Sequence, residues 1–437
     1  MADVCPFRAL RYDPGRVDLS RTIAPPYDVI SPEGQRDLYA RSAENIVRIE
    51  YGEQRPGDDA RENRYTRAAR ELGAWRAAGV LVRDAAPALY AYRQEFSHDG
   101  RSYARDAVFA AVRLTPWDEG AVKPHEHTLA NPKADRLELL RATRTQVSPV
   151  YSLYRHRADP GRPAPMPDCG APLLSCEADG QRHTLWRIDS PAACDAFAAH
   201  LAQCDVYIAD GHHRYETALA YRDEARARAA TWSGEEPENF VLMALTHHAD
   251  PGLLVLPTHR VVTPPSRPAQ PLAALGARFD IEDVTPPAFD ADAVRGLLSL
   301  LAAAGREAPA FVAVGLEGDS AHLLTLSDRA AVEASMPAGH DEAWRRLDVN
   351  VLQYGVLAPA FGISERELTA GGAVSYTQDA SEAIAQARAA GGVAFLLNAT
   401  PVAQVLAVAD AGGRMPQKST YFYPKLPTGL VMNLLAE

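Results

Sequence analysis

The segment 206–230 reads VYIADGHHRYETALAYRDEARARAA. Its first four residues form an apolar run typical of a buried strand, and the residues after Gly211 favour a helix. Gly211 permits the tight turn between these elements because it has no side chain. The segment therefore predicts a strand, a turn and a helix, with Asp210 at the end of the strand.

This turn concentrates groups that bind anions. The free amides at the start of a helix attract phosphate, and Arg214 with the imidazoles of His212 and His213 adds further donors. Adjacent residues entering a helix project about 100° apart, so the two histidines should have different roles. Asp210 is placed to hold Mg²⁺ or to orient an imidazole. The alternative is an aspartate cap on the helix followed by two surface histidines.

The sequence around this segment predicts the α+β class, with helices and strands mixed along the chain. Residues 63–78 show apolar side chains at helical spacing. Residues 88–97 and 103–114 predict a hairpin that turns at His98-Asp99-Gly100. A proline-rich stretch over 158–172 should be a surface linker, because proline cannot donate to a sheet ladder.

The same patterns divide the chain into three parts. Residues 1–157 form an N-terminal α+β segment, and residues 173–263 with 340–437 form a core that contains the anion-binding turn. Residues 264–335 show a strand, a helix and two further strands, which is typical of an inserted α+β subdomain.

The composition is that of a folded protein. Of its residues, 47% are hydrophobic and 23% are charged, as in soluble globular proteins. The length of 437 residues predicts two or three structural units. The net charge of -11 argues against a surface that coats nucleic acid or an anionic membrane. No membrane-spanning apolar run and no signal peptide are recognised, and the five cysteines are scattered without C-x-x-C spacing. We expect a cytoplasmic protein without nucleic-acid or membrane partners, and a homodimer is left open.

Lysine is rare in this chain. Only four of the 45 basic residues are lysines, and they are Lys123, Lys133, Lys418 and Lys425. They fall in two short segments, one around 123–136 and one over 415–425. An ammonium is a compact point charge with rotatable donors that guanidinium does not reproduce. The clustering indicates that both segments carry chemistry, with chance as the alternative.

These two segments combine charged groups with prolines. The first is KPHEHT at 123–128, whose H-x-H spacing fits a metal site or an exposed strand. The second is MPQKSTYFYPK at 415–425, which ends like a P-loop but lacks the glycine-rich turn, so an aromatic strand edge is the alternative. Structural roles are also the alternative for five smaller candidates: Tyr27 with Asp28 in a proline loop, Glu50, and His259 with Arg260.

Taken together, the motifs resemble a family of bacterial and archaeal proteins, the domain of unknown function 1015. The resemblance is carried, in order, by APPYDVIS, PHEHT with KADR and SPVYSLY, YIADGHHRYETAL, LPTHR, LDVNVL and MPQKSTYFYPKLPTGL. These stretches cover almost the whole chain. The DGHHR turn is also similar to the signature of the ParB/sulfiredoxin-like superfamily, which includes partition switches, sulfiredoxin and a free-serine kinase.

The second resemblance implies a ParB/sulfiredoxin-like nucleotide-binding core with ATP or ADP and Mg²⁺ as cofactors. Carried over by position, it places four residues at a phosphate, Gly211, His212, His213 and Arg214, and it places Asp210 beside the metal. Sulfiredoxin activity is not expected, because it needs a cysteine next to the His-Arg pair and Cys204 lies six residues before Asp210.

We therefore expect a phosphotransferase that acts on a small hydroxylated metabolite, with serine or a related amino acid as the best guess. Phosphoryl transfer needs mainly charge neutralisation and in-line positioning. Lys418 and Lys425 would supply charge with Arg214, and Ser419 and Thr420 would donate to phosphate oxygens. A carboxylate would take the proton of the acceptor, and the candidates in order are Glu126, Asp28 and Glu50.

The remaining expectations concern the substrate and the shape of the site. Substrate contacts are expected from Tyr27, His125, Lys133, Asp135, Arg136, His259 and Arg260. The segments 210–214 and 418–425 should lie around one pocket, because each supplies only part of a phosphate site. Two alternatives stay open: hydrolysis of a phosphate ester or anhydride at the same pocket, and a non-catalytic nucleotide or metabolite sensor.

Overall fold

The computed structural model describes residues 1–128, 130–263, 270–370 and 372–436. The chain folds into two compact units, each described here by itself. Unit 1 contains Met1–Pro124, Thr128–Leu253 and Pro424–Glu437, and unit 2 contains His125–His127 and Leu254–Tyr423. This grouping differs from the three predicted parts, because the last residues of the chain belong to unit 1 together with the first ones.

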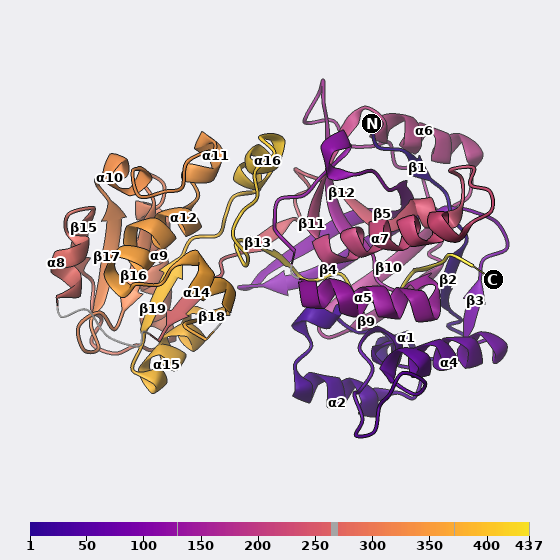
Figure 1. Cartoon of the computed structure of the whole chain (residues 1–437), viewed down its shortest axis with the longest axis horizontal. Helices are drawn as coiled ribbons and strands as arrows, with labels where there is room; N and C mark the ends of the chain where they lie inside the picture. The colour runs from indigo at the N-terminus through magenta and orange to yellow at the C-terminus, as the bar shows by residue number, and fades with distance from the viewer. Residues whose placement is uncertain (129, 264–269, 371, 437) are drawn as a thin grey trace. The chain divides into compact units, whose positions relative to one another are not determined.

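A large mixed sheet forms the centre of unit 1 (Figure 1). Its strands lie in the order β6 (Val122–Lys123), β11 (Cys204–Asp210), β8 (Val150–His156), β12 (Phe240–His247), β5 (Arg101–Arg113), β4 (Leu89–His98), β10 (Gln181–Ile188) and β9 (Leu174–Ala178), and β1 (Val4–Cys5) pairs with β5. Strand β11 runs parallel to β6, and β12 runs parallel to β8, while the other pairs are antiparallel.

The predicted hairpin over 88–114 is confirmed. Strands β4 and β5 pair along their length, and the turn between them places Asp99 and Gly100 at φ 48° and 72°. Glycine and aspartate tolerate this left-handed region better than most residues, so the turn residues match the backbone they must adopt.

Helices cover this sheet because they bury apolar side chains against it. Helix α6 (Pro191–Leu201) and helix α7 (His212–Arg228) contribute Phe197 and Tyr215 to a core that also contains Val206 and Val241 of the sheet. Helix α5 (Ala130–Thr143) lies beside α7 (Figure 1). The predicted strand, turn and helix over 206–230 are thereby confirmed as β11 followed by α7.

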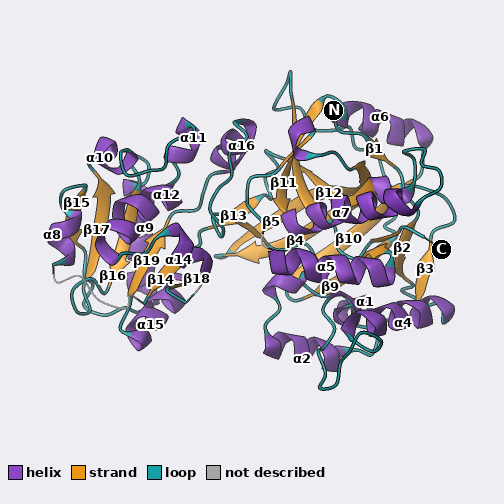
Figure 2. Ribbon diagram, in the orientation of Figure 1, coloured by secondary structure: helices purple, strands orange, loops and turns teal. Residues whose placement is uncertain are grey.

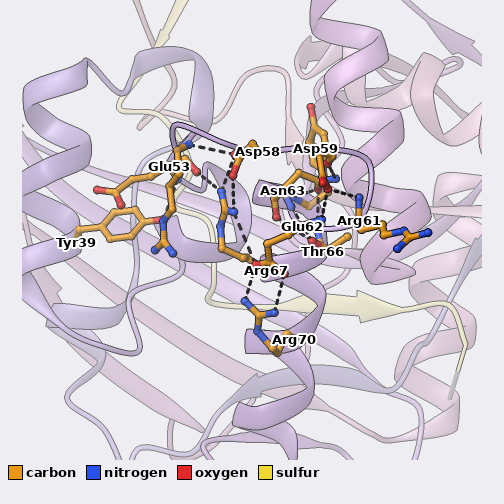
Figure 3. A network of polar contacts seen from close by, with 12 residues as sticks. Tyr39, Glu53, Asp58, Asp59, Arg61, Glu62, Asn63, Thr66, Arg67 and Arg70 are labelled. Carbon is orange, nitrogen blue, oxygen red and sulfur yellow. Dashed lines mark hydrogen bonds and ion pairs between the residues drawn. The ribbon is translucent and has the colours of Figure 1, made fainter.

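Unit 1 contains further helices and a four-stranded sheet. These elements are β2 (Ala9–Tyr12), α1 (Leu19–Thr22), α2 (Pro32–Arg41), α3 (Val47–Glu50), α4 (Arg64–Ala77), β3 (Leu81–Arg83), β7 (Thr145–Gln146) and β21 (Met432–Leu434), and the strands lie in the order β3-β2-β21-β7. Helix α4 packs against both α3 and α5. Asn63 and Thr66 form a reciprocal cap at its start, and both oxygens of Asp58 bind the buried guanidinium of Arg67 at 2.7 and 2.8 Å (Figure 3). These contacts fix the loop that follows α3.

Unit 2 is a six-stranded sheet with helices on both faces (Figure 2). The strand order is β15 (Phe279–Asp283), β17 (Ala321–Leu326), β16 (Ala310–Val314), β19 (Val393–Leu397), β14 (His259–Val262) and β18 (Val374–Thr377). The sheet therefore extends beyond residues 264–335, because β16 of that segment pairs with β19. A separate pair, β13 (Leu254–Leu256) with β20 (Tyr421–Tyr423), contains the aromatic run near the chain end.

The helices of unit 2 form two groups. Helix α9 (Ala291–Ala304) and helix α15 (Ala380–Ala390) share one apolar core with the sheet. The other helices are α8 (Pro271–Leu275), α10 (Arg329–Glu333), α11 (Glu342–Arg345), α12 (Asp348–Leu352), α13 (Ala358–Phe361), α14 (Glu365–Ala370) and α16 (Val402–Asp410). Between α12 and α13 the helix widens into a π-helical turn, Gln353–Leu357, because Pro359 has no N–H for the regular ladder.

The described helices include none that is long and apolar enough to cross a membrane.

Candidate anion-binding site

The centre of the site is Asp210, at the carboxyl end of β11. Its Oδ1 accepts a hydrogen bond from Lys425 Nζ at 2.8 Å, and its Oδ2 accepts one from Arg214 Nη2 at 2.8 Å. Burial opposes ionisation of Asp210, but Lys425 and Arg214 outweigh burial and hold the pKa of this carboxyl well below its usual range. Asp210 therefore stays charged and fixes two cations at the start of α7.

Gly211 makes this arrangement possible. Its φ of 96° lies in the left-handed region, and a Cβ at this position would lie 2.9 Å from Arg214 Nε. Gly211 is the N-cap of α7 and no side chain caps the helix there, so the alternative of an aspartate cap is wrong. His212 is buried, whereas His213 is half-buried, so the two histidines are not equivalent surface residues.

Charged groups surround His213. Burial lowers the pKa of its imidazole, while the carboxylates of Glu216 and Asp28 act in the opposite direction and Lys133 lowers the pKa further. Glu216 Oε2 accepts hydrogen bonds from Lys133 Nζ at 2.8 Å and from Thr128 Oγ1 at 2.6 Å. Lys133 is thereby held beside the first turns of α7.

A second cluster lies at the end of α3. The buried carboxylate of Glu50 places Oε1 3.4 Å from Arg136 Nη1 and accepts a hydrogen bond from Ser148 Oγ at 3.0 Å. Arg136 also donates from Nε to Asp135 Oδ2 at 2.8 Å, and its guanidinium carbon lies 4.1 Å from the ring centroid of Tyr27. The structure thus brings together four of the predicted substrate and proton-transfer residues.

A cavity of about 50 Å³ connects the two clusters. Glu50, Arg136 and Arg214 line it together with apolar side chains that include Val150 and Val241. Glu50 Oε2 and Arg214 Nε are buried and have no hydrogen-bond partner among the described residues. A small cavity lined by an acidic and a basic side chain, each with a buried polar atom that has no described partner, suits a water molecule or a hydroxyl group.

The site does not fit a direct magnesium ligand at Asp210. Each carboxylate oxygen of Asp210 already faces a cation, and Glu216 is held by Lys133. Among the described residues, no group of three or more His, Cys, Asp or Glu side chains is arranged to hold a metal ion.

Several predicted residues belong to unit 2 and are grouped there. His125 Nε2 lies 3.2 Å from Thr420 Oγ1, and Met415 N donates to the carbonyl of His125 at 2.6 Å. Glu126 forms a backbone bridge with Met415. The HEHT and QKST motifs therefore lie side by side although almost 300 positions separate them.

The other predicted residues of unit 2 have local partners. Ser419 is buried and its hydroxyl donates to Pro416 O at 2.5 Å, whereas Lys418 is exposed at a φ of 58°. His259 and Arg260 are buried in β14, where His259 Nδ1 accepts a hydrogen bond from Leu397 N at 3.1 Å. These contacts give His259 a role in packing the sheet.

Sequence reasoning missed Glu216 and the buried pair Gln94 and Arg105. Glu216 stands one helical turn after His212 and His213, so helical spacing could have indicated it. Gln94 and Arg105 are polar residues in strands, and such residues are expected at exposed positions. Nothing in the neighbouring sequence distinguishes these two buried residues from exposed ones.

A comparison with protein-family models confirms the expected family over most of the chain. The family described as "Protein of unknown function (DUF1015)" matches residues 4–350. The chain belongs to the DUF1015 family. No curated protein matches it.

The chain is also distantly similar to several solved structures. A free serine kinase mutant in complex with ADP has 13% identity and a TM-score of 0.37, over 75% of this chain and 92% of that one. A conserved hypothetical protein from Pyrococcus furiosus has 13% identity and a TM-score of 0.34, over 75% and 95%. C-terminally truncated SbnI from Staphylococcus aureus has 11% identity and a TM-score of 0.33, over 74% and 87%. A ParB/sulfiredoxin-like core remains a prediction.

Proposed function

We propose that this DUF1015 protein is a nucleotide-dependent phosphotransferase that binds its phosphate groups at the turn 210–214. The observation that carries the proposal is the pair of cations, Lys425 and Arg214, that Asp210 holds at the start of α7. Helix α7 has 17 residues, so its free amides and dipole add to the attraction for an anion.

The charges suit phosphoryl transfer because they are fixed before a ligand binds. Arg214 Nη1 also donates to the carbonyl of Pro149, and Lys133 is held by Glu216. Side chains with such partners need little reorganisation when charge develops on a phosphoryl group.

Glu50 is the best supported proton acceptor among the three candidates. Glu50 lines the cavity that Arg214 also lines, and its buried Oε2 has no partner among the described residues. A small hydroxylated metabolite such as serine would place its hydroxyl there, with ATP or ADP as the phosphate donor. Asp28 is exposed and lies near His213, and the role of Glu126, which belongs to unit 2, stays a prediction.

The cavity also favours one second candidate. A space that suits a single water molecule next to a carboxylate would equally serve hydrolysis of a phosphate ester or anhydride. Transfer and hydrolysis differ in whether nucleotide consumption requires an organic hydroxyl.

The test is a nucleotide panel followed by product analysis. Thermal unfolding is measured with ATP, ADP and AMP, with and without Mg²⁺, and a ligand at 100 times its Kd should stabilise the protein by about 2.7 kcal/mol. Nucleotides that bind are then incubated with serine and related hydroxyl compounds. Consumption that depends on the hydroxyl compound supports transfer, consumption without it supports hydrolysis, and an intact bound nucleotide supports a sensor.

A further inference from the structure

The segment that brings Lys425 to Asp210 is held by two strands of the large sheet. Arg105 on β5 donates from Nη2 to the carbonyl of Pro424 at 2.7 Å. Gln94 on β4 donates from Nε2 to the carbonyl of Lys425 at 3.3 Å. Two successive carbonyls are therefore bound at the backbone from which the Lys425 side chain extends to Asp210.

Arg105 and Gln94 act as one unit. They face each other across the β4–β5 pair, and Arg105 Nη2 also donates to Gln94 Oε1. Gln94 Nε2 is oriented further by Gln181 Oε1 at 2.6 Å. The amide of Gln94 cannot rotate without losing these bonds, so its N–H group remains directed at Lys425.

The position of Arg105 is costly for a charged residue. It is 1% exposed, and a buried guanidinium destabilises a fold unless its donors are satisfied. Its carbon lies 4.8 Å from the ring centroid of Tyr151, and Gly252 packs so closely that a Cβ there would lie 2.1 Å from Ala104 O. The surrounding chain thus fixes this guanidinium against the segment that contains Lys425.

We propose that Arg105 and Gln94 are positioning residues that set the place of the Lys425 ammonium at Asp210. Lysine has a flexible four-carbon stem, so its reach depends on where the backbone holds its base. A backbone shift of about 1 Å is enough to weaken the hydrogen bond to Asp210. The positioning of Lys425 does not depend on the proposed function. Only the binding of a phosphate ligand by its ammonium rests on that function.

The decisive readout is the pKa of the Asp210 carboxyl in the absence of any ligand. This pKa is measured by carbon-13 NMR of protein with labelled aspartate. Arg105→Lys keeps the charge and loses the planar fork, and Gln94→Glu places an acceptor against the Lys425 carbonyl. Either variant should raise the pKa of Asp210, because the ammonium that lowers it moves away. Lys425→Met gives the full rise for comparison.

Arg93→Lys is the matched control. Arg93 is next to Gln94 on β4 and binds Asp106 of β5 with two hydrogen bonds of 2.8 Å, at the surface. This variant should leave the pKa of Asp210 unchanged. An unchanged pKa in both Arg105→Lys and Gln94→Glu, with a clear rise in Lys425→Met, would overturn the proposal.

Calorimetric titration with ADP and with inorganic phosphate separates this inference from the proposed function. If wild-type protein binds either probe, Arg105→Lys should weaken binding by about tenfold, and the loss should disappear in the Lys425→Met background. An equal loss in both backgrounds would contradict a role through Lys425. Absence of binding to wild-type protein would overturn the proposed function, while the pKa of Asp210 would still decide the positioning role.

Discussion

Lys425 Nζ lies 2.8 Å from Asp210 Oδ1, although 215 positions separate the two residues in the sequence. Arg214 Nη2 lies at the same distance from the other oxygen of Asp210. One buried carboxylate therefore orders two long cationic side chains before a ligand arrives. A ligand then does not bear the entropic cost of immobilising them, which is about 2 kcal/mol for each free side chain.

Replacement of Gly211 tests whether the turn itself matters for ligand binding. Gly211→Ala forces a Cβ against Arg214 at a φ of 96°, so we expect loss of about 1–2 kcal/mol of stability and at least a tenfold weaker affinity for ADP. Gly234→Ala is the control, because Gly234 has a φ of 90° but nothing within 4 Å of the new Cβ. Urea unfolding and ADP titration are measured for both. Equal ADP affinity in the two variants would contradict the role of the turn.

Replacing each of the two adjacent histidines should have a different effect on stability and ligand binding. His212 is buried in unit 1, so His212→Ala should mainly lower the unfolding free energy by leaving a cavity. His213 is half-buried among Asp28, Lys133, Arg214 and Glu216, so His213→Ala should mainly change ligand affinity or turnover. Melting temperature and ADP affinity are compared for each variant. Two variants with the same losses would show that the residues are interchangeable.

Acid should destabilise unit 1 through His183. Burial lowers the pKa of this imidazole to about 4, and its Nδ1 lies 2.7 Å from Tyr92 Oη. Between pH 6.5 and 4 the unfolded chain binds more protons than the folded one, so stability is present above pH 6.5 and falls as the pH drops. The loss attributable to His183 is about 3 kcal/mol. Urea unfolding from pH 7.5 to 4.5 should show a shallower pH dependence in His183→Gln, and an unchanged slope would contradict this assignment.

Asp348 should make unit 2 less stable as the pH rises, which is the opposite of the pH dependence expected from His183. Burial raises the pKa of this carboxyl to about 6, and nearby Arg329 only partly offsets the effect. The folded unit holds a proton that the unfolded chain releases, so stability falls as the pH rises from about 4 to 6. Asp348→Asn should therefore raise the melting temperature at pH 7 and leave it unchanged at pH 4. Scanning calorimetry at both pH values provides the measurement, and a variant that is less stable at pH 7 would contradict the prediction.

Local structure was predicted where neighbouring residues determine it. Strand β11, the glycine turn and helix α7 follow from an apolar run, a residue without a side chain and a helical sequence. The hairpin of β4 and β5 follows from the turn residues Asp99 and Gly100. These features depend on interactions between residues that are close in the chain.

Long-range structure was predicted only in part. The rarity of lysine pointed to Lys425, because an unusual residue type marks a position where a different cation is disfavoured. The placement of Lys418 in unit 2 and of Lys425 in unit 1 had no local signal, since the boundary falls between Tyr423 and Pro424 within one motif. The order of strands in both sheets also depends on packing between distant segments, which sequence periodicity does not encode.

The buried network shows why the support of a site is harder to predict than the site. Arg105 lies in strand β5 next to Asp106, and a charged residue in a strand predicts an exposed position. Its burial becomes intelligible only once the carbonyl of Pro424 is seen beside it. The partner lies 319 positions away, so neither segment alone contains the information.

The most direct test of the phosphate-binding site is calorimetric titration of ADP with Mg²⁺ into wild-type protein, Lys425→Met and Lys123→Met. Lys123 is a matched control, because it pairs with Asp205 at 3.3 Å on the same strand as Asp210. We predict that wild-type protein and Lys123→Met bind ADP equally, and that Lys425→Met binds at least about tenfold more weakly. Equal affinity in all three proteins, or no binding to wild-type protein, would contradict a phosphate site at Asp210, Arg214 and Lys425.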